Sequence, residues 1–379
     1  MGNKKEIMDQ YQKRHAIYQN FAGEVEHQLK RILSEENISY NAITCRLKDA
    51  ESLSGKIDRK GDKYSCLEDL TDIAGVRVIT YYSDDVDKVA DIVEREFFVD
   101  RENSIDKREA LEPDRFGYCS VHYVVGMSEE RLKLREYQSF SGLKCEIQIR
   151  SVLQHAWAEI EHDLGYKNPV ALPKKIRRNF SRLAGLLEIA DKEFEEIRRF
   201  LLSYEEETTK TLRSESEDED VEIDAILLDK LTEINTDIIE INSQIEAIIG
   251  IKFDDDIQPS DYEGSIKKLH WFGIHTLSQL YDFIEKNSHY AVDIAREILG
   301  TYRYTNEGEK VVIHRTIAFF YLCYAELVAN TEKYDFDGFV QYFEEMNIVG
   351  LDKSSREAAF ELFQLREKLG IADESRKRG

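Results

Sequence analysis

The stretch that decides the fold reads Lys144-Cys-Glu-Ile-Gln-Ile-Arg150, and it continues directly into Ser151-Val-Leu-Gln-His-Ala-Trp-Ala-Glu-Ile-Glu-His-Asp-Leu-Gly-Tyr-Lys167. Strict alternation in the first part predicts a strand with one apolar face, and it places Glu146, Gln148 and Arg150 together on the other face. A polar row of this kind is also common at a solvated sheet edge. The segments upstream therefore decide whether the row belongs to a functional site.

Three upstream segments carry matching polar residues. A second strand is predicted over Gly75-Val-Arg-Val-Ile-Thr-Tyr-Tyr82, with Asp72 just ahead of it. The run Phe116-Gly-Tyr-Cys-Ser-Val-His-Tyr-Val-Val-Gly126 indicates a Gly turn that leads into another β-branched strand. Further upstream, Arg46-Leu-Lys-Asp-Ala-Glu-Ser-Leu-Ser-Gly-Lys56 presents three cations and a serine at helical spacing. Together these segments predict a polyphosphate site.

The chemistry of group transfer explains why such residues would be gathered. Transfer of a phosphoryl or pyrophosphoryl group needs cations along the phosphates, and carboxylates that hold Mg²⁺ and orient or deprotonate the attacking hydroxyl. Asp72 and Glu146 suit the carboxylate roles, and two are enough because Mg²⁺ completes its shell with phosphate and water. The cations can cover the phosphates and the base of the donor, because guanidinium planes also stack on purines.

In this order and at these separations, the elements resemble the synthetase domain of the RelA/SpoT family, whose members move pyrophosphate from ATP to the 3′ hydroxyl of GDP or GTP. The resemblance covers roughly residues 40 to 170. It rests on five runs in register: Arg46-x-Lys48-x-x-x-Ser52-x-x-x-Lys56, Asp72-Ile-Ala-Gly-Val-Arg77, Gly117-Tyr-x-Ser-x-His122, Glu146-Ile-Gln-Ile-Arg150, and His155-Ala-Trp157 to His162-Asp-Leu-Gly-Tyr-Lys167. It implies an α/β (α+β) fold, a mixed sheet flanked by helices as in nucleotidyltransferase-like synthetases.

The resemblance also implies a role for each matching residue. Arg46 and Arg77 would sandwich the adenine of ATP. The ATP phosphates would be held by Lys48, Ser52 and Lys56. Mg²⁺ would be bound by Asp72 and by Glu146, which is also the candidate base toward the acceptor hydroxyl. The acceptor pocket would be lined by Tyr118, stacked on guanine, and by Ser120, His122, Gln148 and Arg150.

One departure from the family pattern concerns the acceptor. Long members carry a Lys and an Asn just before the Gly-Tyr pair, where this chain has Asp114, Arg115 and Phe116. Asp114 would repel a diphosphate that a Lys would attract. The identity of the acceptor, GDP, GTP or another 3′ hydroxyl, therefore stays open at this point.

The helix predicted over Ser151 to Lys167 allows two interpretations. His155, Glu159 and His162 fall at i, i+4 and i+7, which is one helical face and a plausible zinc constellation. A fourth ligand of the right type does not follow, and the HExxH order is missing. We therefore favour the second interpretation, in which Trp157 packs inward and the polar side chains support the sheet edge or the phosphates.

Composition restricts the class of protein. The 379 residues carry a formal charge of −23 and a pI near 4.9, which argues against general affinity for nucleic acid. A local basic patch over residues 46–63 nevertheless has the sign that a nucleotide requires. The five cysteines are scattered without a CxxC pair, so neither a zinc knuckle nor a disulfide framework is predicted. Without a signal peptide or an 18-residue apolar run, the chain is expected to be cytoplasmic and not membrane-bound.

The apolar spacing predicts four parts. Residues 1–40 form an N-terminal helix packed on the core, residues 41–204 the pyrophosphokinase-like domain with a closing helix from Lys174 to Tyr204, and residues 205–224 an acidic linker. Residues 225–379 form an all-α regulatory or partner-binding domain, with separate helices over 277–286 and 290–299 among its elements. A Gly turn over Gly273–Leu277 has Thr276 as the N-cap of the next helix. The closing helix would cover the sheet or pair with a copy of itself in a homo-oligomer.

Three functions are left open by the sequence. The first is an ATP-dependent GTP diphosphokinase that makes (p)ppGpp and lacks its own hydrolase, because a hydrolase domain does not fit ahead of residue 40. The second is a toxin-type pyrophosphokinase that modifies the 3′ end of tRNA, restrained by the C-terminal domain or by another protein partner. The third is a silent nucleotide-binding module. Intact Asp72 and Glu146 argue against the third, and the acidic composition argues against the second.

Overall fold

The computed structural model describes residues 2–60, 63–106, 120–166, 173–214, 221–253, 259–300, 313–349 and 353–371. The chain divides into two compact units, Met1–Arg199 and Phe200–Gly379, each with its own hydrophobic core. None of the described helices is long and apolar enough to cross a membrane.

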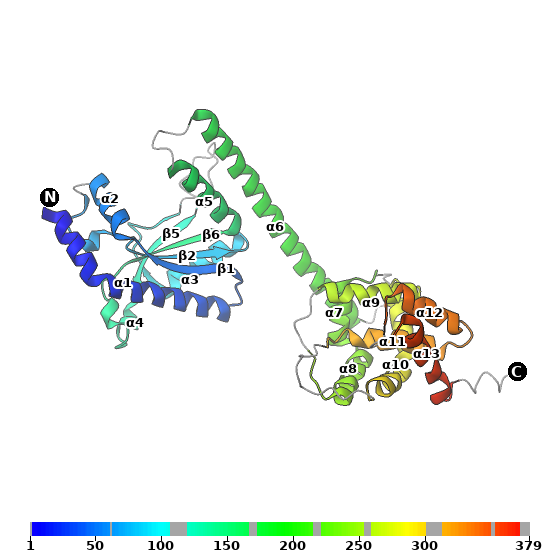
Figure 1. The fold of residues 1–379 in the computed structure, drawn as a ribbon. Helices are drawn as coiled ribbons and strands as arrows, with labels where there is room; N and C mark the ends of the chain where they lie inside the picture. The colour runs from blue at the N-terminus through cyan, green and yellow to red at the C-terminus, as the bar shows by residue number, and fades with distance from the viewer. Residues whose placement is uncertain are drawn as a thin grey trace. The chain divides into compact units, whose positions relative to one another are not determined.

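The N-terminal unit is built on a mixed sheet (Figure 1). Its order is β1-β2-β6-β5-β3, with the short β4 paired to β5. Its strands are β1 (Tyr40–Leu47), β2 (Ala74–Thr80), β3 (Phe97–Val99), β4 (Ile105–Asp106), β5 (Val121–Met127) and β6 (Cys145–Ser151). The pair β2 and β6 is parallel, and the other pairs are antiparallel. The predicted mixed α/β sheet flanked by helices is therefore confirmed.

One face of this sheet is apolar and covered by helices. Alternate residues of the central strands, such as Val76 and Ile147, are buried in a single cluster with α1 (Gly2–Glu35) and α3 (Asp84–Glu96). The same cluster takes in α2 (Ala50–Lys60) through Leu53, and the 3-10 turn η2 (Leu67–Asp69) through Leu67. The short elements α4 (Glu129–Leu132) and η3 (Gln138–Phe140) complete this unit. Because neighbouring strand residues point to opposite faces, burial of this set leaves the polar set on the other side.

Two helices follow β6. The first, α5 (Val152–Tyr166), begins directly after the strand and packs against β6 and β2. The second, α6 (Lys174–Ser214), is tied to the N-terminal unit by Asp191, which accepts a bond from Ser151 Oγ at 2.9 Å, and by Arg198. Arg198 donates to Asp85 at 2.8 Å and lies 4.5 Å from the centre of the Tyr82 ring.

The sequence predicted an acidic linker over residues 205–224. In the structure, residues 205–214 are helical and belong to α6, so this part of the prediction is wrong. Thr208 and Leu212 are buried there, and Leu212 joins the core of the C-terminal unit. The acidic residues of this segment lie between these buried positions and do not interrupt the helix, because Glu is a good helix former. The division between the units falls within this helix, at Arg199 and Phe200. Residues 215–220 of the predicted linker lie outside the described residues.

The described part of the C-terminal unit is helical apart from an isolated bridge between Glu222 and Thr276. Its helices are α7 (Ala225–Ile234), α8 (Thr236–Ile249), α9 (Pro259–Trp271), α10 (Leu277–Leu299), α11 (Ile317–Ala329), α12 (Phe336–Glu345) and α13 (Ser355–Lys368). Gly273 has the positive φ of 81° that the predicted turn needs, and Thr276 is the N-cap residue of α10, as predicted. The predicted break at residues 287–289 is wrong, because α10 is continuous and Asn287 is fully buried, bonded to Glu326 of α11.

The tie between α6 and α3 generates a first prediction. Asp85 is 1% exposed, so Arg198→Ala leaves a buried carboxylate with Lys88 as its remaining cationic partner. We expect the free energy of unfolding of the N-terminal unit to fall by about 1–3 kcal/mol. The chain has two tryptophans, and a Trp271→Phe background leaves Trp157 to report this unit in urea titrations. Arg199→Ala, at the exposed neighbouring position, is the control, and an equal loss in both variants would contradict the role of the tie.

Candidate functional site

Strand pairing gathers the predicted site residues on the polar face of the sheet. In the parallel pair, Gly75 lies beside Glu146 and Arg77 beside Gln148. On one side β1 places Arg46 opposite Gly75, and on the other β5 places His122 opposite Gln148. One face of the sheet therefore presents side chains from four adjacent strands, although these residues are spread from Arg46 to Arg150 in the sequence.

A chain of hydrogen bonds crosses this face from β5 to β6. Ser120 Oγ lies 2.6 Å from His122 Nε2, and His122 Nδ1 lies 2.9 Å from Glu146 Oε1. Gln148 Nε2 donates to Glu146 Oε2 at 2.9 Å, and Arg150 donates to Gln148 Oε1 at 3.4 Å. Each residue of the alternating row is therefore bonded to the next.

Glu146 is held as a carboxylate. Burial raises its pKa, but the hydrogen bonds from His122 and Gln148 and the charge of His122 outweigh burial and leave the pKa below its usual value. Asp72 acts in the opposite sense on this pKa, because a second negative charge nearby disfavours ionisation. Glu146 is consequently ionised at neutral pH and can accept a proton or bind a cation.

Asp72 lies in the turn between η2 and β2, with two lysines on one of its oxygens. Lys48 Nζ is 2.8 Å and Lys56 Nζ 2.7 Å from Asp72 Oδ2. Burial raises the pKa of Asp72, and the two lysines more than offset it, so this carboxyl is ionised too. Its other oxygen, Oδ1, is buried and has no hydrogen-bond partner in the described structure. A buried carboxylate oxygen in that position fits a metal ion.

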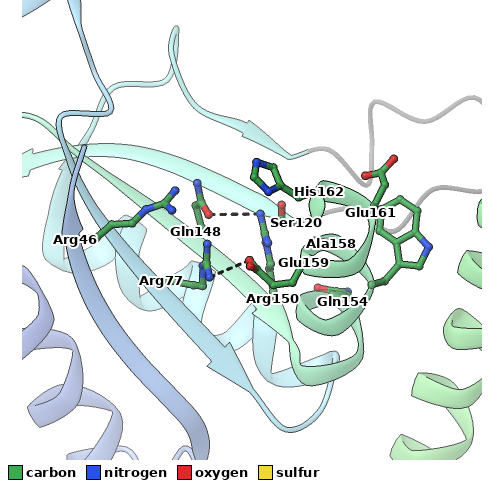
Figure 2. Close-up of a pocket in the computed structure, with 11 residues that line it drawn as sticks. Arg46, Arg77, Ser120, Gln148, Arg150, Gln154, Ala158, Glu159, Glu161 and His162 are labelled. Carbon is green, nitrogen blue, oxygen red and sulfur yellow. Dashed lines mark hydrogen bonds and ion pairs between the residues drawn. The ribbon is translucent and has the colours of Figure 1, made fainter. Parts of the chain in front are cut away.

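Helix α5 covers part of the polar face and forms a cavity with it. The cavity has a volume of about 340 Å³, and Figure 2 shows the sheet residues Arg46, Arg77 and Arg150 facing Glu159 of α5 across it. Arg77 Nη1 lies 3.0 Å from Glu159 Oε1. Burial and the nearby charge of Arg77 lower the pKa of Arg150. Three arginines of the sheet thus line the cavity together with polar residues and two glutamates of α5, and the arginines supply the positive charge that a polyphosphate ligand requires.

The structure brings most of the predicted residues together. Arg46, Arg77, Ser120, Gln148 and Arg150 line the cavity. Beside it, Asp72 joins Lys48 and Lys56, and Glu146 joins His122. Ser52 is exposed on α2, one turn before Lys56. Tyr118, like Asp114, Arg115 and Phe116, lies outside the described residues.

Two observations concern α5, for which the sequence also allowed a zinc site formed by His155, Glu159 and His162. Glu159 is paired with Arg77, and no group of three His, Cys, Asp or Glu side chains that could hold a metal occurs among the described residues. Gln154, Glu159 and Glu161 line the cavity, which the sequence reasoning missed. For Gln154 and Glu161 the signal was available, because these two residues share a helical face with Trp157, whose ring packs on Phe180 of α6.

Comparisons with known proteins find similar sequences over the N-terminal part of the chain. A family profile described as "Region found in RelA / SpoT proteins" matches residues 45–171. The GTP pyrophosphokinase YjbM of Bacillus subtilis (strain 168) is 33% identical over 162 residues, which are 41% of this chain and 71% of the relative. The GTP pyrophosphokinase YwaC of the same organism is 26% identical over 199 residues, 50% of this chain and 91% of the relative.

Solved structures of similar chains cover the N-terminal half. The small alarmone synthetase 1 from Bacillus subtilis has 27% identity and a TM-score of 0.43, over 52% of this chain and 99% of that one. A GTP pyrophosphokinase family protein from Streptococcus pneumoniae has 29% identity and a TM-score of 0.43, over 52% and 96%.

Fold and site together define an α/β domain whose polar sheet face is built for a polyphosphate ligand. With its identity to YjbM over more than two thirds of that protein, the chain belongs to the RelA/SpoT family, and it is longer than the relatives it matches. The C-terminal unit lies outside the region that the family profile matches.

Proposed function

We propose that this protein is a (p)ppGpp synthetase, an ATP-dependent GTP diphosphokinase that transfers pyrophosphate from ATP to the 3′ hydroxyl of GDP or GTP. Two relatives named GTP pyrophosphokinase support this activity. The observation that carries the proposal is the pair of ionised carboxylates, Asp72 and Glu146, of which Glu146 is hydrogen-bonded to Gln148 in the wall of a cavity that three arginines also line. Anionic acceptors of protons and metals beside a cationic surface are what pyrophosphoryl transfer requires.

The donor would occupy the cationic side. Arg46 and Arg77 face the same cavity from adjacent strands, and we assign them to the two faces of adenine. Lys48 and Lys56, with Ser52 on the same helix as Lys56, are assigned to the phosphates. Since two lysines share one aspartate, this cluster carries a net positive charge toward the phosphates.

On the acceptor side, Glu146 is the proposed base. The oxygen of the 3′ hydroxyl attacks the β-phosphorus of ATP, the bond from that phosphorus to the oxygen bridging the α-phosphate breaks, and AMP leaves. The hydroxyl proton goes to the carboxylate of Glu146, which its pKa leaves ionised and ready to accept it. Gln148 and Arg150, next to Glu146 on β6 and lining the cavity, are assigned to the acceptor nucleotide together with Ser120 and Tyr118.

A divalent metal suits the donor set, and we propose Mg²⁺. Asp72 Oδ1, the buried oxygen without a protein partner, and the carboxylate of Glu146 would hold it. When bound, the ion neutralises charge on the phosphates. Hard carboxylate oxygens favour Mg²⁺ over softer metals.

We assign the C-terminal unit a regulatory or partner-binding role without chemistry of its own, and we place the protein in the cytoplasm, where its nucleotides are. Exposed apolar residues on α6, namely Leu183, Leu186 and Ile189, line a shallow groove and support the predicted self-association.

The activity is tested by following label from the γ-phosphate of ATP. The protein is incubated with Mg²⁺ and, in separate reactions, GDP, GTP or deacylated tRNA, and the products are resolved. We expect label on the guanine nucleotides with AMP released in equal amount. Transfer to tRNA alone would replace this function by the toxin-type activity, and transfer to no acceptor would leave a nucleotide-binding module.

A further prediction concerns the base. Glu146→Gln keeps the shape of the side chain but removes its charge, so transfer should fall by about 10²- to 10⁴-fold while ATP binding stays largely intact. Turnover and calorimetric ATP affinity are measured on the same preparation. Glu129→Gln, at an exposed position in α4, is the charge-matched control. Turnover at the wild-type rate in the Glu146 variant would remove this residue from the site.

The donor assignment predicts a separate loss of affinity. Arg46→Ala and Arg77→Ala should each weaken ATP binding by roughly 1–2 kcal/mol, because stacking and charge are lost together. Arg135→Ala, which removes an exposed cation between α4 and η3, is the control and should change little. Calorimetry with unchanged ATP affinity in both site variants would exclude the adenine sandwich.

A further inference from the structure

His122 shares the polar face of the sheet with the acceptor residues but differs from them in its surroundings. It is 8% exposed, and the residues that line the cavity include Ser120, Gln148 and Arg150 but not His122. Both nitrogens of its ring already have protein partners, Ser120 on one side and Glu146 on the other. A ligand in the cavity therefore finds no free hydrogen-bonding atom on His122.

The two ring nitrogens contact groups of different kinds, a carboxylate and a hydroxyl. A carboxylate accepts through its oxygens, so in the contact with Glu146 we assign the donor to His122 Nδ1. The other ring nitrogen, Nε2, lies 2.6 Å from Ser120 Oγ, so the hydroxyl holds that side of the ring. Because Ser120 is 5% exposed, this anchor is shielded from water.

The carboxylate of Glu146 is consequently clamped from two directions. His122 of β5 binds Oε1, and Gln148, two residues along β6, binds Oε2. Two donors on different strands fix the plane of the carboxylate, while each oxygen keeps a second lone pair for a reacting group. The carboxylate must meet the acceptor hydroxyl while that hydroxyl is in line with the phosphorus atom. A fixed carboxylate favours this alignment, because small misplacements lower the rate of reaction.

We propose that His122 is a positioning residue that aims the Glu146 carboxylate at the acceptor hydroxyl, with Ser120 anchoring the ring, and that it does not bind the acceptor nucleotide. This inference rests on the proposed function, in which Glu146 is the base. It differs from the role that the family resemblance implied, in which His122 lines the acceptor pocket.

Three substitutions at one position separate the possible roles of the ring. In His122→Asn the side-chain amide nitrogen can replace Nδ1 and still donate to Glu146. The longer His122→Gln places its amide near the position of Nε2, toward Ser120, and His122→Ala has no donor. A positioning role therefore predicts that Asn rescues activity and that Gln and Ala do not.

The test measures kcat and KM for both nucleotides in the full-length protein, with thermal melting as a check on folding. We expect kcat to fall about 10- to 100-fold in His122→Gln and His122→Ala, and to stay within roughly 3-fold of wild type in His122→Asn. The KM values for ATP and GTP should change less than about 2-fold. A rise in acceptor KM at unchanged kcat, or equal losses in all three folded variants, would overturn the proposal.

A spectroscopic measurement tests the contact between His122 and Glu146 independently of the proposed activity. In a ¹H–¹⁵N correlation spectrum of ¹⁵N-histidine-labelled protein, the His122 signals are those that disappear in His122→Asn. We expect a proton on Nδ1, and a shift of its signals in Glu146→Gln. A ring without a proton on Nδ1 would overturn the contact whatever the enzyme does, whereas a protonated Nδ1 in a protein that transfers no pyrophosphate would refute the proposed function and with it the aiming role.

Discussion

The parallel pairing of β2 with β6 is the constraint on which the site depends. It sets Gly75 beside Glu146 and Arg77 beside Gln148, and it leaves the alternate residues of both strands in the core. A slip of one residue would turn Glu146 and Arg77 into the core and bring apolar side chains to the polar face. The hydrophobic cluster on one side thus determines the chemistry on the other, because burial of Val76 and Ile147 fixes the register.

On the polar face, the surrounding groups keep both candidate carboxylates, Asp72 and Glu146, ionised. Both Asp72 and Glu146 are largely buried, which by itself would raise the pKa of each. Two lysines compensate for Asp72, whereas hydrogen bonds from His122 and Gln148 compensate for Glu146. The two carboxylates are therefore kept ionised by different kinds of groups. Lysines on Asp72 leave a net positive charge for phosphates, while hydrogen bonds hold Glu146 as an ionised carboxylate that can accept the proton of a hydroxyl.

The sequence predicted the sheet and most of the site because alternation is a local property. The faces of β6 and β2 follow from period-two patterning alone, and the alternation also puts Glu146, Gln148 and Arg150 in one row. Partners across elements were harder to predict. Nothing local indicates that Glu159 meets Arg77, or that both ring nitrogens of His122 are taken by Ser120 and Glu146.

Helix limits failed for a related reason. The acidic composition of residues 205–214 suggested a linker, but buried Leu212 adds tertiary contacts that composition does not reveal. Likewise, separate helices were predicted on either side of residues 287–289, yet α10 is continuous there and the buried side-chain nitrogen of Asn287 donates to Phe283 O and to Glu326. In both cases a contact from another part of the fold outweighed the local preference. Tyr118 is a different case, since its position is outside the described residues.

The charges of this protein favour a nucleotide over a nucleic acid as the ligand of this site. The chain carries a formal charge of −23, and a long polyanion that lies along the surface meets much of that charge. A nucleotide is small, so it interacts mainly with charges close to the site, among them Arg46, Arg77 and Arg150 of the cavity. Charges farther away than one Debye length, about 8 Å at physiological salt, are largely screened. The excess negative charge elsewhere is then screened, and the local cations dominate. A tRNA could overcome the same repulsion only through additional basic contacts, and its affinity would then fall steeply with salt, whereas that of a nucleotide depends on the few charges in the cavity.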